Sequence, residues 1–108
     1  MDATELIRRY EAGERDFHEV ELGQTDLSGA RLIGVDLSGA DLCGANLCGA
    51  VLSRANLTGA NLTGADLTWT NLSNAMLAGA ILRDVRVSAA PIIGASLAAS
   101  AATSDQVA

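Results

Sequence analysis

Residues 40–67, ADLCGANLCGAVLSRANLTGANLTGADL, place a leucine at every fifth position. A helix advances by about 100° per residue, so leucines five apart would scatter around its axis. In a flat strand the odd spacing would send successive leucines to opposite faces. The remaining arrangement is a chain that turns a corner every five residues, so that every leucine points into the same interior. The spacing therefore predicts a winding chain.

The same register continues on both sides of this stretch. It gives seventeen consecutive apolar centres from Phe17 to Leu97. Two residues before each centre the sequence has mostly alanine, otherwise valine or threonine, with Arg15 as the exception. Because two is an even offset, both residues of such a pair share one face of an extended segment. The pattern predicts a narrow core in which large and small side chains alternate.

The other three positions of each repeat carry residues that are typical of tight turns. The residue before the centre is usually Asp or Asn, and the two after it are Ser, Thr or Cys and then Gly. Glycine tolerates a positive φ, and short polar side chains bond to nearby backbone groups, so these positions suit a tight turn facing water. The pattern A-(D/N)-L-(S/T/C)-G resembles the motif of the pentapeptide repeat family. The resemblance covers residues 17–97.

This resemblance implies an all-β fold, the right-handed quadrilateral β-helix, in which four repeats make one square coil of twenty residues. The chain would form about four such coils. We expect residues 1–16 to be an N-terminal capping helix and entry segment, residues 17–97 the β-helix, and residues 98–108 a flexible C-terminal tail. A single repeat buries too little apolar surface to be stable, so coils must stabilise one another by stacking.

The N-terminal segment has the signals of a short helix that covers the first coil. Asp2 and Glu5 form a capping-box pattern, and Gly13 is a C-terminal stop. Residues 13–17, GERDF, resemble the entry segment of small cyanobacterial members of the family, in which a short helix precedes a phenylalanine. The alternative is that residues 1–12 are a frayed tail. The expected cap consists of Leu6, Ile7, Tyr10 and Phe17.

The C-terminal end lacks the features of a cap. Pro91 removes a backbone donor from a possible ladder, and the residues after Leu97 have no hydrophobic period. Either the last coil limits itself, or another chain covers it. We therefore expect a possible homodimer through the C-terminal coils, with its edge at Ile92, Ile93 and Leu97.

Candidate chemistry is sparse. The chain has one histidine, His18, and no lysine, and its regularly spaced serines and threonines form no group of nucleophile, base and orienting residue. Cys43 and Cys48 raise the question of a disulfide or a metal site, but they fall in neighbouring repeats around a corner and lack further ligands. They are better read as small substitutes for Ser or Thr. We expect no enzymatic activity, no cofactor and no bound metal.

The start of the chain has no basic segment followed by an apolar run, which predicts a cytoplasmic protein without a signal peptide. The uncharged stretch of residues 87–104 consists mainly of Ala, Ser and Gly, so it is too weakly apolar for a membrane span.

Charge separates two possible functions. The net charge is −6, and residues 1–41 hold ten of the thirteen acids. Some pentapeptide repeat proteins resemble duplex DNA in size and negative surface and inhibit DNA gyrase, a type II topoisomerase. DNA carries one charge per about 1.7 Å, whereas the central repeats here offer asparagine instead. We therefore expect a non-enzymatic protein–protein interaction module or regulator with an unidentified protein partner, with gyrase inhibition by DNA mimicry as the alternative. Direct nucleic-acid binding is not expected.

Apolar residues replace polar ones at several outward positions of the C-terminal half. Such exposed patches typically mark a partner site. The alternative is that the chain's own tail covers Met76 and Ile81. The candidate interaction surface comprises Val51, Trp69, Met76, Ile81 and Ile93.

Overall fold

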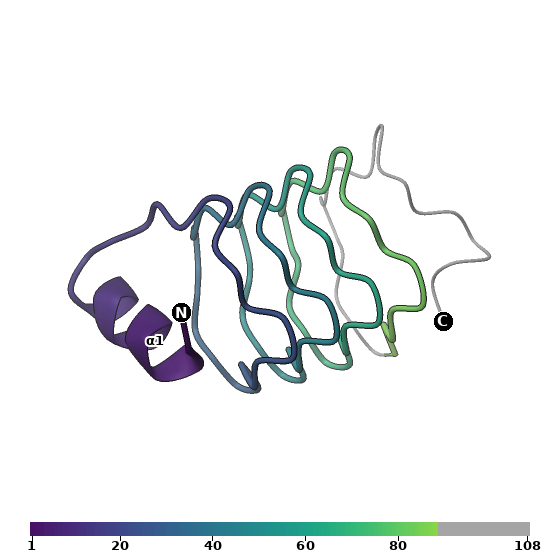
Figure 1. The fold of residues 1–108 in the computed structure, drawn as a ribbon, viewed down its shortest axis with the longest axis horizontal. Coiled ribbons are helices and arrows are strands. Elements are labelled where there is room, and N and C mark those ends of the chain that lie inside the picture. The colour runs from purple at the N-terminus through teal and green to yellow at the C-terminus, as the bar shows by residue number, and fades with distance from the viewer. Residues whose placement is uncertain (89–108) are drawn as a thin grey trace.

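The computed structural model describes residues 1–88, which form a short helix followed by a stack of coils (Figure 1). Helix α1, Ala3–Glu11, lies at the N-terminal end of the stack. The coils are joined by parallel β-bridges, and every bridge pairs residues twenty apart, from Asp16 with Asp36 to Asp66 with Arg86. Each bridge stands alone because a corner follows every five residues and leaves no room for a longer strand.

Bridges recur every five residues along the chain, so each coil has four sides, which we call walls 1 to 4. Each wall is defined by its apolar centres. Wall 1 contains Phe17, Leu37, Leu57 and Leu77; wall 2 contains Leu22, Leu42, Leu62 and Leu82; wall 3 contains Leu27, Leu47, Leu67 and Val87; wall 4 contains Leu32, Leu52 and Leu72.

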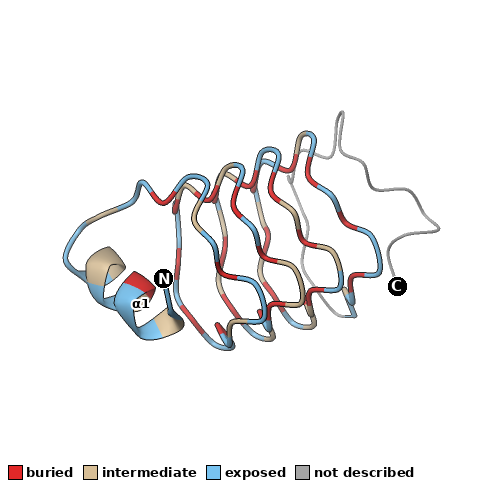
Figure 2. Ribbon diagram, viewed as in Figure 1, coloured by how far each residue is buried: buried red, intermediate tan, exposed pale blue. Residues whose placement is uncertain are grey.

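The interior consists of these centres and the alanines two residues before them. Every centre from Phe17 to Leu82 is at most 4% exposed, and Ala40 to Ala80 are fully buried wherever alanine occupies that inner position. Figure 2 shows the resulting regular alternation of buried and exposed segments around each coil. Thr70 is the buried polar exception, and its hydroxyl donates to the carbonyl of Leu47 at 2.6 Å. The predicted core of large and small side chains is confirmed.

Hydrogen bonds explain the residue preferences at the corners. In the repeat around Leu27, the amide of Ala30 donates to the Leu27 carbonyl at 3.1 Å, and Gly29 has a φ of 70°. A positive φ at the third turn residue is the geometry for which glycine is favoured. The carboxylate of Asp26 accepts from the Ser28 amide at 3.0 Å. The same contact, from Asp or Asn to the amide two residues on, recurs along the stack, which accounts for the acid or amide before most centres.

Helix α1 has well-defined ends. At its start, the Asp2 carboxylate accepts from the Glu5 amide at 2.8 Å. After Ala12, Gly13 has a φ of 106°, its amide donates to the Tyr10 carbonyl at 2.9 Å, and the Glu14 amide donates to the Arg9 carbonyl at 3.0 Å. This pair of bonds is a Schellman motif. The predicted N-terminal helix is confirmed.

The helix packs on the open end of the first coil. Leu6 is fully buried, and Ile7 and Tyr10 lie against the core cluster that contains Phe17. The Tyr10 hydroxyl donates to the Ile33 carbonyl at 2.6 Å, so α1 is also bonded to wall 4 in the first coil. None of the described helices is long and apolar enough to cross a membrane. Ile92, Ile93, Leu97 and the proposed boundary between residues 97 and 98 lie outside the described residues.

Candidate interaction surfaces

Trp69 is the most exposed large apolar side chain of the described residues, at 67%. It lies at the corner where wall 3 turns into wall 4, one coil above Gly49. Its backbone has a φ of 61°, in the left-handed region, where glycine occupies many of the equivalent corners. A non-glycine residue in that conformation costs about 1–2 kcal/mol. Trp69 thus has a strained backbone conformation, and its large aromatic side chain is mostly exposed to solvent.

The other candidate residues lie on different walls. Met76 is 45% exposed on wall 1 and pairs with Asn56, whereas Ile81 is 38% exposed on wall 2 and pairs with Asn61. Val51 is half-buried on wall 4, and Ile93 is outside the described residues. The structure therefore does not bring Trp69, Met76 and Ile81 together on one wall. Of the described candidates, Val51 and Trp69 are the two that border wall 4.

The ionisable groups of the repeats form local pairs. Nδ1 of His18 lies 2.6 Å from the Asp16 carboxylate, and both side chains are more than half exposed. This contact raises the pKa of His18 and lowers the pKa of Asp16. Above the raised pKa of His18 the pair loses its charge attraction, an effect that solvent keeps small at such exposure. Within residues 1–88, Asp16 thus orients an exposed imidazole that has no nucleophile among its hydrogen-bond partners.

Cys43 and Cys48 are both free and half-buried. They lie on walls 2 and 3, around a corner from each other. Burial, and then the Asp41 carboxylate, raise the pKa of the Cys43 thiol, which keeps it protonated and weakly nucleophilic. In the part of the chain that the structure describes, no three His, Cys, Asp or Glu side chains gather as metal ligands would.

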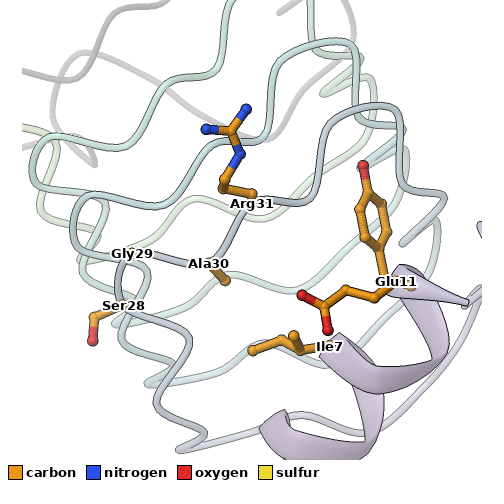
Figure 3. A pocket seen from close by; sticks show the side chains of 7 residues that line it. Ile7, Glu11, Ser28, Gly29, Ala30 and Arg31 are labelled. Carbon is orange, nitrogen blue, oxygen red and sulfur yellow. The ribbon is translucent and has the colours of Figure 1, made fainter.

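A groove of about 470 Å³ lies at one side of the contact between α1 and the first coil. Figure 3 shows Ile7 and Glu11 of the helix on one side and Ala30 of the coil on the other. Tyr10 contributes to the apolar lining, and Arg31 lies at the edge that leads onto wall 4. Neither this groove nor Arg31 was predicted from the sequence, although arranging the sequence in rows of twenty would have placed Arg31 directly below Val51.

Comparison with known proteins supplies the family. A family model described as pentapeptide repeats matches residues 16–49 and 50–88. A pentapeptide repeat protein from the Arabidopsis thaliana thylakoid lumen aligns at 35% identity and a TM-score of 0.67, covering 72% of this chain and 52% of that one. One from Nostoc PCC 7120 aligns at 36% identity and a TM-score of 0.60, covering 84% of this chain and 75% of that one. This chain thus spans about half the length of the Arabidopsis protein.

A plasmid-mediated fluoroquinolone resistance protein also matches, at 20% identity and a TM-score of 0.30, over 78% of this chain and 61% of that one. That similarity is too low to carry an argument about function. A comparison with curated protein sequences finds no match. Pentapeptide repeat proteins fold as right-handed quadrilateral β-helices, in agreement with the four walls of this chain. From its repeats, its coils of twenty residues and these matches, the chain belongs to the pentapeptide repeat family.

Proposed function

We propose that this protein is a non-enzymatic interaction module that acts in the cytoplasm and binds another protein with Trp69 as an anchor. The observation that supports this most is the 67% exposure of the Trp69 side chain. Tryptophan is also enriched among residues that dominate binding energy at protein interfaces.

The rigidity of the stack supports the same proposal. The Trp69 amide donates to the Ser88 carbonyl at 3.0 Å, and the Thr70 amide donates to the Leu67 carbonyl at 3.0 Å. The first hydrogen bond joins the corner that carries Trp69 to the next coil, and the second closes the turn of residues 67–70. A side chain on such a preorganised support loses little backbone freedom when it binds.

Replacing Trp69 with glycine is expected to raise stability and abolish partner binding. Relief of the left-handed strain outweighs the greater freedom of glycine in the unfolded chain, so the free energy of unfolding should rise by about 0.5–1 kcal/mol. Gln24→Gly is the matched control, because Gln24 is also neutral, exposed and at a φ of 59°. Urea unfolding and affinity capture from the native host measure the two effects.

In this experiment a partner captured by wild-type protein and by Gln24→Gly, but absent with Trp69→Gly, is the predicted result. Equal capture by all three proteins would remove Trp69 as the anchor. A marked loss of stability in Trp69→Gly would show that the indole stabilises the fold, which contradicts the assigned role.

The alternative function, inhibition of gyrase by DNA mimicry, is supported by the acids of the first coils. On wall 1 the bridged column begins with Asp16 and Asp36 but continues with Asn56 and Met76. On this wall the negative charge therefore ends with the second coil, and each of the next two coils has one outward acid, Asp66 and Asp84. Duplex DNA carries its charges about 1.7 Å apart without interruption, so the match is poor.

We expect no inhibition of gyrase in a DNA supercoiling assay, even with the protein in large molar excess. A negative result with correctly folded protein supports the interaction module. Strong inhibition that weakens with added salt and with Asp36→Asn would instead establish mimicry.

A further inference from the structure

The four walls differ in charge. Among the outward residues of the described repeats, wall 1 has three acids and no arginine, wall 2 has three acids and one arginine, and wall 3 has two acids and one arginine. Wall 4 has no acid and two arginines, Arg31 and Arg54. A protein with a net charge of −6 thus has one wall whose outward residues carry a net positive charge.

The two arginines of wall 4 are available to a partner. Both are exposed, and neither takes part in an ion pair within the described residues. They lie in successive coils, about 4.8 Å apart along the stack and three residue positions apart along the wall, which is at most about 10 Å because Arg54 lies in the turn at the corner. An extended segment in the polyproline II conformation has three residues per turn and rises about 3.1 Å per residue, so its side chains three residues apart share one face and lie about 9 Å apart. Carboxylates three residues apart in a bound segment could therefore meet both guanidinium groups.

Apolar groups border the same wall. Val51 is bridged to Arg31 and lies in the same coil as Arg54, and Ile33 is 37% exposed. The groove lined by Ile7, Tyr10 and Glu11 adjoins Arg31 at the N-terminal end of wall 4 (Figure 3). Trp69 lies two coils further along the stack, at the corner between walls 3 and 4. The hydrogen bond from Tyr10 to the Ile33 carbonyl holds the groove and the wall together. The surface therefore offers apolar contacts and a positive charge in a fixed arrangement.

We propose that wall 4 docks an acidic, extended segment of a partner protein, with Arg31 and Arg54 meeting its carboxylates and Trp69 its apolar side chains. This inference rests on the proposed function and adds the wall and the chemistry of the partner. Charge complementarity favours such a segment, because opposite charges across an interface speed association and select partners. A nucleic acid fits less well, since two arginines would face many phosphates while the other walls repel them.

The test uses full-length protein and an acetylated, amidated peptide of four Glu-Val-Ser repeats, which places a carboxylate at every third residue. The matched control peptide has Lys in place of Glu. Two-dimensional amide NMR during titration reports which wall each peptide contacts. We expect shifts at Arg31, Val51, Arg54 and Asn71 with the acidic peptide alone, weakening between about 0.05 M and about 0.5 M salt.

The charge-reversed variant R31E/R54E should bind the acidic peptide about tenfold more weakly and gain affinity for the lysine peptide. The control variant R83E/R86E changes the net charge of the protein by the same amount as R31E/R54E, but its substitutions lie on walls 2 and 3. It should bind the acidic peptide as the wild type does. If charge reversal disturbs the fold, as the amide spectrum would reveal, R31Q/R54Q gives the same comparison with neutral side chains, and loss of binding is again expected.

Several results would overturn the inference. They are the absence of shifts, shifts on other walls, equal losses in the two charge-reversed variants, or tighter binding of single-stranded oligothymidylate to wall 4. Shifts of wall 4 that depend only on protein concentration would assign it to a second copy of the chain instead. Any of these results combined with Trp69-dependent capture of a protein would leave the proposed function standing, so the two failures are distinguishable.

Discussion

Leu57→Asp is expected to abolish folding. Leu57 is fully buried at the centre of wall 1, with coils on both sides. An aspartate there would place an unpaired charge in a core made of leucine and alanine, a change that exceeds the entire stability of a small domain. Far-UV circular dichroism and the dispersion of amide NMR signals should both show an unfolded chain.

The neighbouring substitution Thr58→Asp is the matched control. Thr58 is exposed at the corner of the same repeat, so the same new charge would lie in water. It should change stability by no more than about 0.5 kcal/mol. A folded, cooperative Leu57→Asp protein would show that this centre is not enclosed.

Removal of residues 1–12 has the second largest expected effect. It uncovers the first coil, where α1 buries Leu6 completely and lies close to Phe17. The uncovered edge would present unpaired backbone groups and apolar surface, both of which promote association. We expect the truncated protein to unfold at lower urea concentration and to form aggregates in size-exclusion chromatography with light scattering.

Two point variants separate the cap from the rest of the helix. Leu6→Ala should lower the free energy of unfolding by about 2–4 kcal/mol, because it leaves a cavity under α1. Arg8→Ala, on the exposed side of the same helix, should have almost no effect. A truncated protein that stayed monomeric with unchanged stability would contradict a capping role for α1.

The interior and the capping helix could be predicted because both follow from local rules. A period of five with an alanine two residues before each centre permits one interior, and Asp2 and Gly13 mark the ends of α1 by their hydrogen-bonding and backbone preferences. The bridges between residues twenty apart confirm that register.

The surface was harder to predict for physical reasons. Outward residues that are close in sequence lie on different walls, whereas one wall brings together residues that are about twenty positions apart. A partner that contacts one wall therefore contacts residues that are distant in sequence. Trp69, Met76 and Ile81 are close in sequence and were predicted to form one surface, although they lie on three parts of the coil. The arginines of wall 4 were not predicted for the same reason, since Arg31 and Arg54 are twenty-three residues apart.

The conformation of Trp69 could not be predicted from the sequence either. Residue preference alone assigns a positive φ to glycine, but stacking imposes it on whichever residue occupies that corner. Arg54 and Asn74 adopt it as well, at φ values of 61° and 60°. Tertiary structure thus overrides the local preference at these corners.

The four walls exist only if side chains twenty residues apart are aligned, and nuclear Overhauser contacts between backbone protons test this alignment most directly. We predict contacts across the wall 1 bridges, between the neighbourhoods of Asp36 and Asn56 and of Asn56 and Met76, together with equivalent contacts on the other walls. Contacts at another spacing, or none between distant residues, would contradict the coil of twenty and the four walls derived from it.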